Sequence, residues 1–359
     1  MDINYITYDS WWDTDKDILP ILTNHFRVRI YSIDKEVGNK YSHKEKFKSL
    51  SLNTYISGSN RSIKEIFRSF IFVLKLVVKS SKDSIFVFWI GNNIYILLFA
   101  FLFLKRSRTV IGIHNFIEHG NNNKSFYARM KKILYLKYRY FMFYSETQKE
   151  LFDFKYAGKN SYHLLMPLKN FGNKTKRKNE VRTFLFFGYV SPYKRLDLFI
   201  KAAQVLQCKN VRFIIAGYTN QWEQFNKLII DKSQFELNIR YVKDSEIPNL
   251  FSESDFLVLP YDDSTQSGPL LVAINYGIPV IATNLPTFRK WIKNKSNGFL
   301  FNVGKLDELE AIFSKVSTMT DKDVCDMKKN VLKTKAEYEK SVKVLDVYLQ
   351  IINDINNKV

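Results

Sequence analysis

The stretch Tyr261–Gly277, YDDSTQSGPLLVAINYG, combines polar side chains with the start of a helix. It follows an apolar run, DFLVLP, that is typical of a buried strand. Ser267 is a favoured N-terminal cap, Pro269 suits the first helical turn, and Gly277 suits the helix end. The unpaired N–H groups of this helix would then lie at the carboxyl edge of a parallel sheet, where anionic ligands bind. The pattern predicts a phosphate site, with an ordinary capped helix as the alternative.

A second strand end carries a glycine and a lysine. The run FFGYVSPYKRLDLFIKAA (186–203) indicates a strand that ends at Gly188 and a helix that begins at Lys194. A cation is disfavoured at a helix N-terminus because the helix dipole is positive there. An anionic ligand would offset that repulsion, whereas a solvated lysine is the alternative.

Apolar runs that alternate with helical patterns define the elements that must position these residues. The chain has 359 residues, of which 46% are hydrophobic, and this is enough for two domains. The strand candidates are 4–8, 27–32, 85–90, 109–114, 140–145, 162–166, 183–188, 211–217, 239–242, 255–260, 279–283 and 298–301. Continuous apolar strands between helices are typical of buried parallel sheets. We therefore predict an α/β fold with two Rossmann-like domains.

The domain boundaries follow from composition. The segment 166–182, MPLKNFGNKTKRKNEVR, is polar, basic and aperiodic, and we interpret it as a linker. We expect a first domain over 1–165, a second over 183–336, and a C-terminal helix in 337–359 that packs back on the first domain. The apolar segment 85–104 is interrupted by GNN at 91–93, which favours a strand, a turn and a short buried helix over a membrane span.

The N-terminal sequence and the cysteines indicate the compartment. The chain begins with a predicted strand and shows no signal-peptide pattern. Its two cysteines, Cys208 and Cys325, are far apart and match no disulfide framework or metal-binding spacing. A cytoplasmic protein is the expectation.

The order of these motifs resembles the family 4 glycosyltransferases of the GT-B fold. The resemblance covers most of 183–317: Gly188 and Lys194, then IIAG, a polar strand end before the helix start, and YGIPVIATNLPTFRKWIKNKSNGFLF. In the first half, TVIGIHNFIEH and YFMFYSETQKELF are similar to the family's acceptor domain. The resemblance implies two Rossmann-like domains whose parallel sheets face each other across a cleft. It also implies a nucleotide-sugar donor bound chiefly by the second domain, and retaining transfer without a metal or other cofactor.

The resemblance assigns the donor contacts to the second half. Lys194 matches the family lysine that pairs with the donor diphosphate, but Tyr189 stands where the family has an arginine. The family's two glutamates are replaced by Ser264 and Val272, and Gln266-Ser267-Gly268 looks like the version found in bacterial polysaccharide synthesis. The helix start is expected to bind the diphosphate, and the DDSTQ side chains the hexose hydroxyls. The donor-binding candidates are Gly188, Tyr189, Lys194, Gly217, Asp262, Asp263, Ser264, Thr265, Gln266, Ser267, Gly268 and Pro269.

The acceptor candidates lie in the first half. His114 ends a predicted strand and matches the family histidine that contacts the transferred sugar near its reacting carbon, so His114 and Lys194 are the catalytic candidates. A buried core histidine is the alternative. The loop DSWWDTDKD (9–17) lies where the acceptor enters this fold, and its DTD resembles the metal-binding DxD of the GT-A fold, which we interpret as coincidence. The acceptor-binding candidates are Trp11, Asp13, Asp15, Glu118 and His119, and no metal site is predicted.

The positive charge is concentrated in the first half. The net charge is +20, and residues 1–180 hold 31 Lys and Arg against 15 Asp and Glu. Such a basic half implies an anionic partner. At about 100° per helical residue, one narrow stripe on an apolar helix contains Arg61, Lys64, Arg68, Lys75, Lys79 and Lys82. The stripe favours an anionic membrane surface, with a solvated helix face as the alternative.

These features together predict an enzyme. We expect it to move a sugar from a nucleotide sugar to a lipid-linked saccharide in capsule, O-antigen or exopolysaccharide synthesis. It would work at the inner face of the cell membrane, without a nucleic-acid partner. A DNA-modifying GT-B transferase is one alternative. A non-catalytic, membrane-bound glycosyltransferase-like partner is the other, which the missing glutamates keep open.

Overall fold

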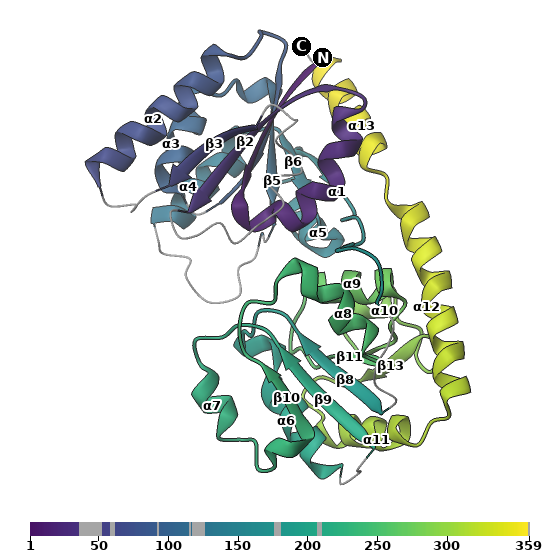
Figure 1. The fold of residues 1–359 in the computed structure, drawn as a ribbon. Helices are drawn as coiled ribbons and strands as arrows, with labels where there is room; N and C mark the ends of the chain where they lie inside the picture. Colours follow the sequence, from purple (N-terminus) through teal and green to yellow (C-terminus); the bar gives the residue numbers. More distant parts are fainter. Residues whose placement is uncertain are drawn as a thin grey trace. The chain divides into compact units, whose positions relative to one another are not determined.

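The computed structural model shows two compact α/β units (Figure 1). One unit comprises Met1–Pro167 with Val342–Val359, and the other comprises Leu168–Ser341. The α/β class predicted from the sequence is confirmed, because each unit is built on a parallel sheet covered by helices. The structure describes residues 1–35, 52–57, 62–91, 93–114, 116, 126–175, 181–206 and 210–357.

The first unit contains a sheet in the order β3-β2-β1-β4-β5-β6-β7, with every pairing parallel. Strands β4 and β5 are buried along their whole length, which explains their continuous apolar sequence, since helices cover both faces of the sheet. The strands are β1 Asp2–Tyr8, β2 Arg27–Lys35, β3 Leu52–Ser57, β4 Ile85–Trp89, β5 Thr109–Ile113, β6 Tyr140–Phe143 and β7 Asn160–His163.

The helices of the first unit form two layers. Figure 1 shows α2, α3 and α4 on one side of the sheet and α1 with α13 on the other. The C-terminal helix α13 is fixed there by the Tyr162 hydroxyl, which donates to Asp354 at 2.5 Å, and by Arg108, which donates to Asn356 at 3.3 Å. The helices are α1 Trp12–Thr23, α2 Ile63–Val78, α3 Ile94–Phe103, α4 Phe126–Lys137, α5 Glu146–Lys155 and α13 Val344–Asn356.

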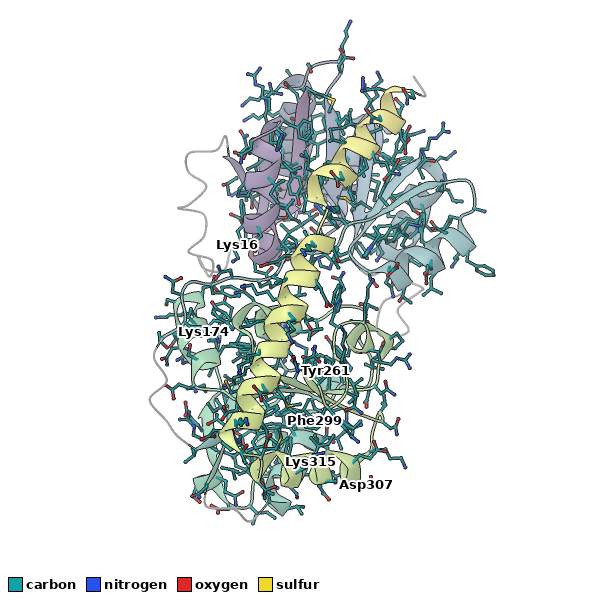
Figure 2. The ribbon with its side chains drawn as sticks, turned by 90° about the vertical axis from the view of Figure 1, so that its right-hand side faces the viewer. Lys16, Lys174, Tyr261, Phe299, Asp307 and Lys315 are labelled. Carbon is teal, nitrogen blue, oxygen red and sulfur yellow. The ribbon has the colours of Figure 1, made fainter. Side chains whose placement is uncertain are left out.

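The second unit contains a sheet in the order β10-β9-β8-β11-β12-β13, again with parallel pairings. Figure 2 shows Tyr261 and Phe299 among the side chains that fill this unit, and both are almost fully buried. The strands are β8 Arg182–Phe187, β9 Val211–Ala216, β10 Phe235–Asn238, β11 Phe256–Leu259, β12 Val280–Thr283 and β13 Gly298–Phe301. The helices are α6 Leu196–Val205, α7 Trp222–Asn226, α8 Ile247–Ser252, α9 Gly268–Tyr276, α10 Pro286–Arg289, α11 Leu306–Ser317 and α12 Asp321–Ser341.

Three sequence-based expectations about the elements are corrected. Strand β3 was not predicted, and the strand expected at 239–242 lies instead at Phe235–Asn238. Helix α2 ends at Val78, so Lys82 lies beyond it, and Arg61 is outside the described residues. Within the part of the chain that the structure describes, no helix combines the length and apolar character needed to cross a bilayer.

Both sheets reverse their strand order beside their first strand. In the first unit β1 lies between β2 and β4, and in the second unit β8 lies between β9 and β11. Ligands of open α/β sheets bind beyond the carboxyl ends of the strands at such a reversal. The two points at which to look for a site are therefore the ends of β1 and β4 and the ends of β8 and β11.

Candidate functional site

Two glycines shape the end of strand β8. Gly188 has φ 107°, a conformation that side chains rarely adopt, and a Cβ on Gly217 would lie 1.9 Å from the Gly188 carbonyl oxygen. Gly217 therefore allows the ends of β8 and β9 to approach closely. A Cβ on Gly188 would lie 3.4 Å from Cγ of Pro269 and 3.8 Å from Nζ of Lys194. At the end of strand β8, Gly188 thus lies close to both Lys194 and the start of α9.

Lys194 is a buried cation close to Gly188. It is 9% exposed, and its Nζ lies 5.6 Å from the centre of the Tyr261 ring. No carboxylate within the described ranges forms an ion pair with it, and burial lowers the pKa of Lys194 to about 8. A desolvated ammonium without a counter-ion is costly, and an anionic ligand would relieve that cost.

The turn that holds Lys194 corrects the prediction that this residue begins a helix. Lys194 ends a 3-10 turn that starts at Pro192, and α6 begins only at Leu196. Between them Arg195 adopts φ 51°, and its guanidinium donates to Asp197 at 2.9 Å and to Asp262 at 2.9 Å. These two ion pairs fix the turn, so that the neighbouring lysine is held inside.

The start of helix α9 is as predicted. The Ser267 hydroxyl accepts a hydrogen bond from the Leu270 N–H, and Gly277 ends the helix with φ 63°. A second lysine lies beside this helix start: Nζ of Lys169 is 3.4 Å from the position of a Cβ on Gly268, and Lys169 is 7% exposed. Sequence reasoning missed Lys169, because a lysine in an aperiodic basic segment is typical of a solvated linker. The α9 N-terminus therefore has two buried lysines close to it.

The polar loop after β11 contains side chains that are hydrogen-bonded within the unit and a buried side-chain oxygen that, among the described residues, is not. Asp262 is bound by Arg195, and the Ser264 hydroxyl donates to the Gln266 carbonyl at 3.2 Å. The Ser264 carbonyl accepts from the Thr287 hydroxyl at 2.7 Å. In contrast, the side-chain oxygen of Gln266 is buried and has no hydrogen-bond partner in the described part of the chain. Gln266 is therefore the side chain of this loop most in need of a ligand hydroxyl. Asp263 is exposed and Thr265 half-buried in the same loop.

Tyr189 changes the chemistry at the position of the family arginine. Its side chain is 56% exposed, and its ring centre lies 6.2 Å from that of Tyr218, which is 49% exposed. The two tyrosines follow the ends of β8 and β9. They offer aromatic faces to a ligand but no second cation.

In the first unit, the structure brings Trp11 and His114 together. Their ring centres are 3.2 Å apart with the rings edge-on, beyond the ends of β1 and β5. Trp89 and Tyr144 stack beneath them at 4.4 Å. Trp11 and His114 are half-buried, so this edge of the sheet is an aromatic surface with an imidazole. Glu118 and His119 lie outside the described residues.

The prediction that Asp15 contacts an acceptor is wrong. Asp15 is 1% exposed, and its two oxygens accept hydrogen bonds from the Tyr5 hydroxyl at 2.7 Å and the Thr7 hydroxyl at 2.6 Å. Burial, together with the nearby Asp15 carboxylate, raises the pKa of Tyr5 well above its ordinary value. Asp15 is a structural residue of the core, whereas Asp13 is half-buried in the first turn of α1.

The DTD sequence does not form a metal site. Asp13 and Asp15 both lie in α1, and residues two apart on a helix do not face each other. Among the described residues, no group of three or more His, Cys, Asp or Glu side chains is placed to hold a metal ion. That the reaction needs no metal stays a prediction.

The second unit is similar to known proteins. Residues 169–334 match the family model of glycosyl transferases group 1. An uncharacterized glycosyltransferase of Haemophilus influenzae is 25% identical over 173 residues, which are 46% of this chain and 48% of that protein. This chain thus spans about half the length of the curated relative it matches. The resemblance to glycosyltransferases predicted from the sequence is confirmed over this unit.

Solved structures share the fold of the whole chain. Anabaena HepE, solved in complex with UDP and glucose, aligns over 99% of this chain and 100% of its own, with a TM-score of 0.70 and 13% identity. The lipopolysaccharide outer core galactosyltransferase WaaB aligns over 100% of both chains, with a TM-score of 0.64 and 15% identity. The predicted GT-B class is confirmed at the level of fold, whereas the expectation that the sheets face each other across a cleft stays a prediction.

Proposed function

Because the second unit matches the glycosyl transferases group 1, we propose that the protein is a retaining glycosyltransferase that uses a nucleotide-diphosphate sugar. Its acceptor would be a lipid-linked saccharide in surface polysaccharide synthesis. The observation that carries this proposal is Lys194, a buried ammonium without a carboxylate partner in the described chain, beside the N-terminus of α9. A diphosphate supplies the missing negative charge.

The donor diphosphate would be held by a cation and a helix start. The N–H groups of the first turn of α9 and the Lys194 ammonium both favour negative charge at Gly188. Negative charge grows on the diphosphate as the sugar leaves, so these fixed groups stabilise the transition state more than the ground state. Lys169, near Gly268, would add a second positive charge where Tyr189 replaces the family arginine. This arrangement needs no metal ion.

The donor sugar and base would contact the polar loop and the exposed tyrosines. The unpaired oxygen of Gln266 is suited to accept from a hexose hydroxyl, and Asp263 and Thr265 lie in the same loop. The Tyr189 and Tyr218 rings offer a flat surface to the base. Ser264 cannot replace the carboxylate of a glutamate, so the sugar contacts of this chain differ from those of family members that carry both glutamates.

The first unit would bind the acceptor. We assign the contact with the transferred sugar to His114 and a stacking surface for an acceptor ring to Trp11, because the two rings meet at the carboxyl edge of the sheet. WaaB, which has the same fold, is a lipopolysaccharide outer core galactosyltransferase. The basic first half supports an anionic membrane surface as a partner, and with it a location at the cytoplasmic face of the membrane.

A panel of nucleotide sugars tests this proposal. The purified protein is mixed with UDP-, GDP-, ADP- and TDP-sugars, and both the melting temperature and donor hydrolysis are measured. One base class should raise the melting temperature and be hydrolysed slowly without an acceptor, and Lys194→Ala should lose both effects. If no member of the panel binds or reacts, the proposed function is wrong and the non-catalytic alternative is favoured.

A further inference from the structure

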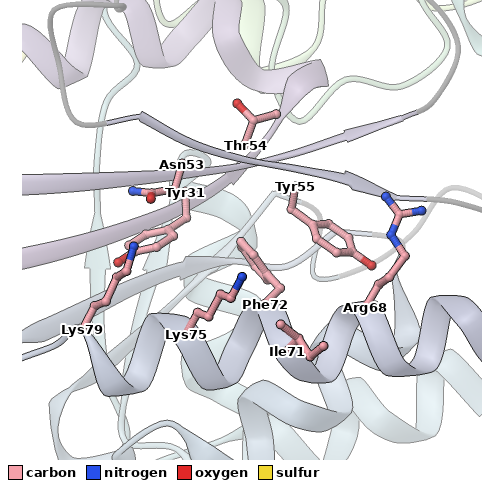
Figure 3. A pocket seen from close by; sticks show the side chains of 9 residues that line it. All are labelled: Tyr31, Asn53, Thr54, Tyr55, Arg68, Ile71, Phe72, Lys75 and Lys79. Atoms are coloured by element: carbon pink, nitrogen blue, oxygen red, sulfur yellow. The ribbon is translucent and has the colours of Figure 1, made fainter.

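A pocket in the first unit is lined by three cations and contains no residue of the donor loop. It has a volume of about 370 Å³ and lies between helix α2 and strands β2 and β3. Figure 3 shows Arg68 and Lys75 on α2 and Lys79 directly after its last residue, all extending toward the strands. The pocket is lined by Tyr31, Asn53, Thr54, Tyr55, Arg68, Ile71, Phe72, Lys75 and Lys79. None of these described lining residues is acidic, so no lining side chain within the described part of the chain offsets the positive charge.

The spacing on α2 explains why the cations converge. Positions 68, 75 and 79 are separated by seven and four residues, which places them on one stripe of the helix. The buried side of α2 carries Ser69, Val73 and Leu76, which anchor it to the sheet. The helix therefore holds its cations over the edge of the sheet, where β3 is the outermost strand.

Tyr31 supplies a second, independent sign of a ligand. It is 3% exposed and lines the pocket, but its hydroxyl has no hydrogen-bond partner within the described residues. Burial raises the pKa of Tyr31, so the hydroxyl stays a neutral donor at physiological pH. A buried hydroxyl without a partner costs free energy that an acceptor atom in the pocket would recover.

Tyr55 lines the same pocket, but its hydroxyl, unlike that of Tyr31, has hydrogen-bond partners among the described residues. Its hydroxyl donates to Glu65 at 2.7 Å and lies 3.0 Å from the Ser69 hydroxyl. The guanidinium of Arg68 lies 5.8 Å from the centre of the Tyr55 ring. The Oε1 atom of Glu65 thus accepts from Tyr55 and also from Asn93, which donates to it at 2.8 Å, and both contacts are buried. Tyr55 and Phe72, whose ring centres are 4.8 Å apart, form an apolar wall.

We propose that this pocket binds the phosphate group of a phosphorylated ligand, a site separate from the donor loop. A guanidinium, two ammonium groups and a hydroxyl are donors only toward such a group, and a phosphate offers several acceptor oxygens and about two negative charges. The wall of Tyr55 and Phe72 packs against the carbon skeleton attached to the phosphate. The volume suits a head group rather than a polymer. The inference does not depend on the transfer reaction, because every residue named lines the pocket or supports it.

Calorimetric titration with pyrophosphate tests the site. All variants are made in a Lys194→Ala background, which weakens anion binding by the second unit. Lys75→Gln with Lys79→Gln should weaken pyrophosphate binding by about tenfold or more, and Tyr31→Phe by about tenfold. The matched control is Lys64→Gln, which removes an exposed cation of α2 that does not line the pocket and should change affinity less than about twofold. Equal affinities in the pocket variants and the control would overturn the proposal.

The melting temperatures of the ligand-free variants show whether a loss of binding comes from a folding defect. Tyr31→Phe removes a hydroxyl that has no partner to lose, so the melting temperature of the ligand-free protein should not fall. Tyr55→Phe breaks the contacts with Glu65 and Ser69 and should lower it. If Tyr31→Phe destabilises the protein as much as Tyr55→Phe, the Tyr31 hydroxyl has a structural role and the proposal is wrong.

Vesicles distinguish the two sources of phosphate. If the ligand is a lipid head group, Tyr31→Phe should bind phosphatidylglycerol vesicles more weakly than Lys64→Gln, and phosphatidylcholine vesicles should bind neither. If the ligand is a free phosphate compound, the two variants should bind vesicles alike while pyrophosphate binding still falls in Tyr31→Phe. If Tyr31→Phe binds both pyrophosphate and vesicles as well as Lys64→Gln does, the pocket is not a phosphate site.

Discussion

The carboxyl edges of the two sheets share a topology and differ in what they bury. In the second unit the edge holds Lys194 without an ion-pair partner in the described chain, next to the start of α9. In the first unit the corresponding edge holds Trp11 and His114, and the charged residue below them, Asp15, is bound by two hydroxyls. We therefore propose that one edge binds an anion and the other an aromatic or sugar ring.

The comparison shows that burial alone does not identify a functional residue. Asp15 and Lys194 are both almost fully buried, at 1% and 9% exposure. Each carboxylate oxygen of Asp15 accepts a hydrogen bond from a hydroxyl of its own unit, so that its burial serves the fold. Lys194 has a desolvated charge that the described residues of its unit leave uncompensated, and we propose that its burial serves a ligand.

The largest expected effect comes from Lys194→Ala. The variant loses a charge-assisted contact with the diphosphate, worth about 1.5–3 kcal/mol. Transfer at subsaturating donor should fall by about tenfold to a hundredfold, as measured by initial rates. Lys201→Ala, an exposed lysine on α6, is the control and should keep its rate. Unchanged kinetics in Lys194→Ala would show that this residue does not bind the donor, and its burial would then have no different role from that of Asp15.

Asp15→Ala tests the other half of the contrast. It leaves the Tyr5 and Thr7 hydroxyls buried without their acceptor, which should lower the free energy of unfolding by on the order of 2 kcal/mol. Donor affinity should stay the same. Asp13→Ala, at a half-buried position of the same helix, should change stability by less than about 0.5 kcal/mol. Chemical denaturation measures both, and equal stability of the two variants would contradict a structural role for Asp15.

The depressed pKa of Lys194 predicts a pH dependence of donor binding. Its pKa of about 8 without ligand means that the amine loses its proton as pH rises above 8. Diphosphate affinity should fall by roughly tenfold between pH 8 and 9.5, because the neutral amine gives no ionic contact. Lys194→Arg keeps its charge and should show a flat profile in calorimetric titrations over this range. A falling profile in both proteins would assign the titration to another group.

The lowered pKa of Lys194 also predicts that the free energy of unfolding rises with pH, whereas donor affinity falls. The folded protein holds fewer protons than the unfolded chain between pH 8 and the ordinary lysine pKa of 10.5. Lys194 should therefore make the anion-free protein more stable as pH rises through this window. Lys194→Met should lack that contribution, which thermal unfolding at pH 7.5 and 10 measures against wild type.

Chelation should have the smallest effect. If the N-terminus of α9 and Lys194 offset the charge of the leaving diphosphate as proposed, EDTA should change the rate by less than about twofold. Loss of turnover in EDTA with recovery on adding manganese would contradict this, and would require a metal site that Asp13 and Asp15 do not provide.

The sequence predicted the strands that are buried on both faces, but it missed one edge strand, β3, and misplaced another, β10. Strands such as β4 and β5 are continuous apolar runs, so their pattern is unambiguous. Strand β3, LNTYIS, is an edge strand in which polar residues interrupt the apolar ones, and it was overlooked. In β10 the apolar pattern of 239–242 was placed four residues late, because the exposed edge tolerates Glu236 and Asn238 within the strand.

The site was predictable where chemistry follows local sequence. Ser267 and Gly277 have capping preferences that do not depend on the rest of the fold, and the structure bears them out. The roles of Asp15 and Lys169 depend on contacts that no sequence pattern indicates. Asp15 reaches back to the strand before it, and Lys169 lies beside Gly268, about a hundred residues further along the chain. Such pairings become visible only in three dimensions.

The most direct test of the central claim isolates the diphosphate. A nucleoside and its diphosphate, with the base that the nucleotide-sugar panel selects, differ only in that group. The difference between their binding free energies therefore measures what the second unit contributes to holding the diphosphate. We expect wild type to bind the nucleoside diphosphate far more tightly than the nucleoside, and Lys194→Ala to lose about tenfold or more of that preference while binding the nucleoside unchanged. If Lys194→Ala keeps the full preference for the diphosphate over the nucleoside, the buried lysine does not hold the diphosphate and the account is wrong.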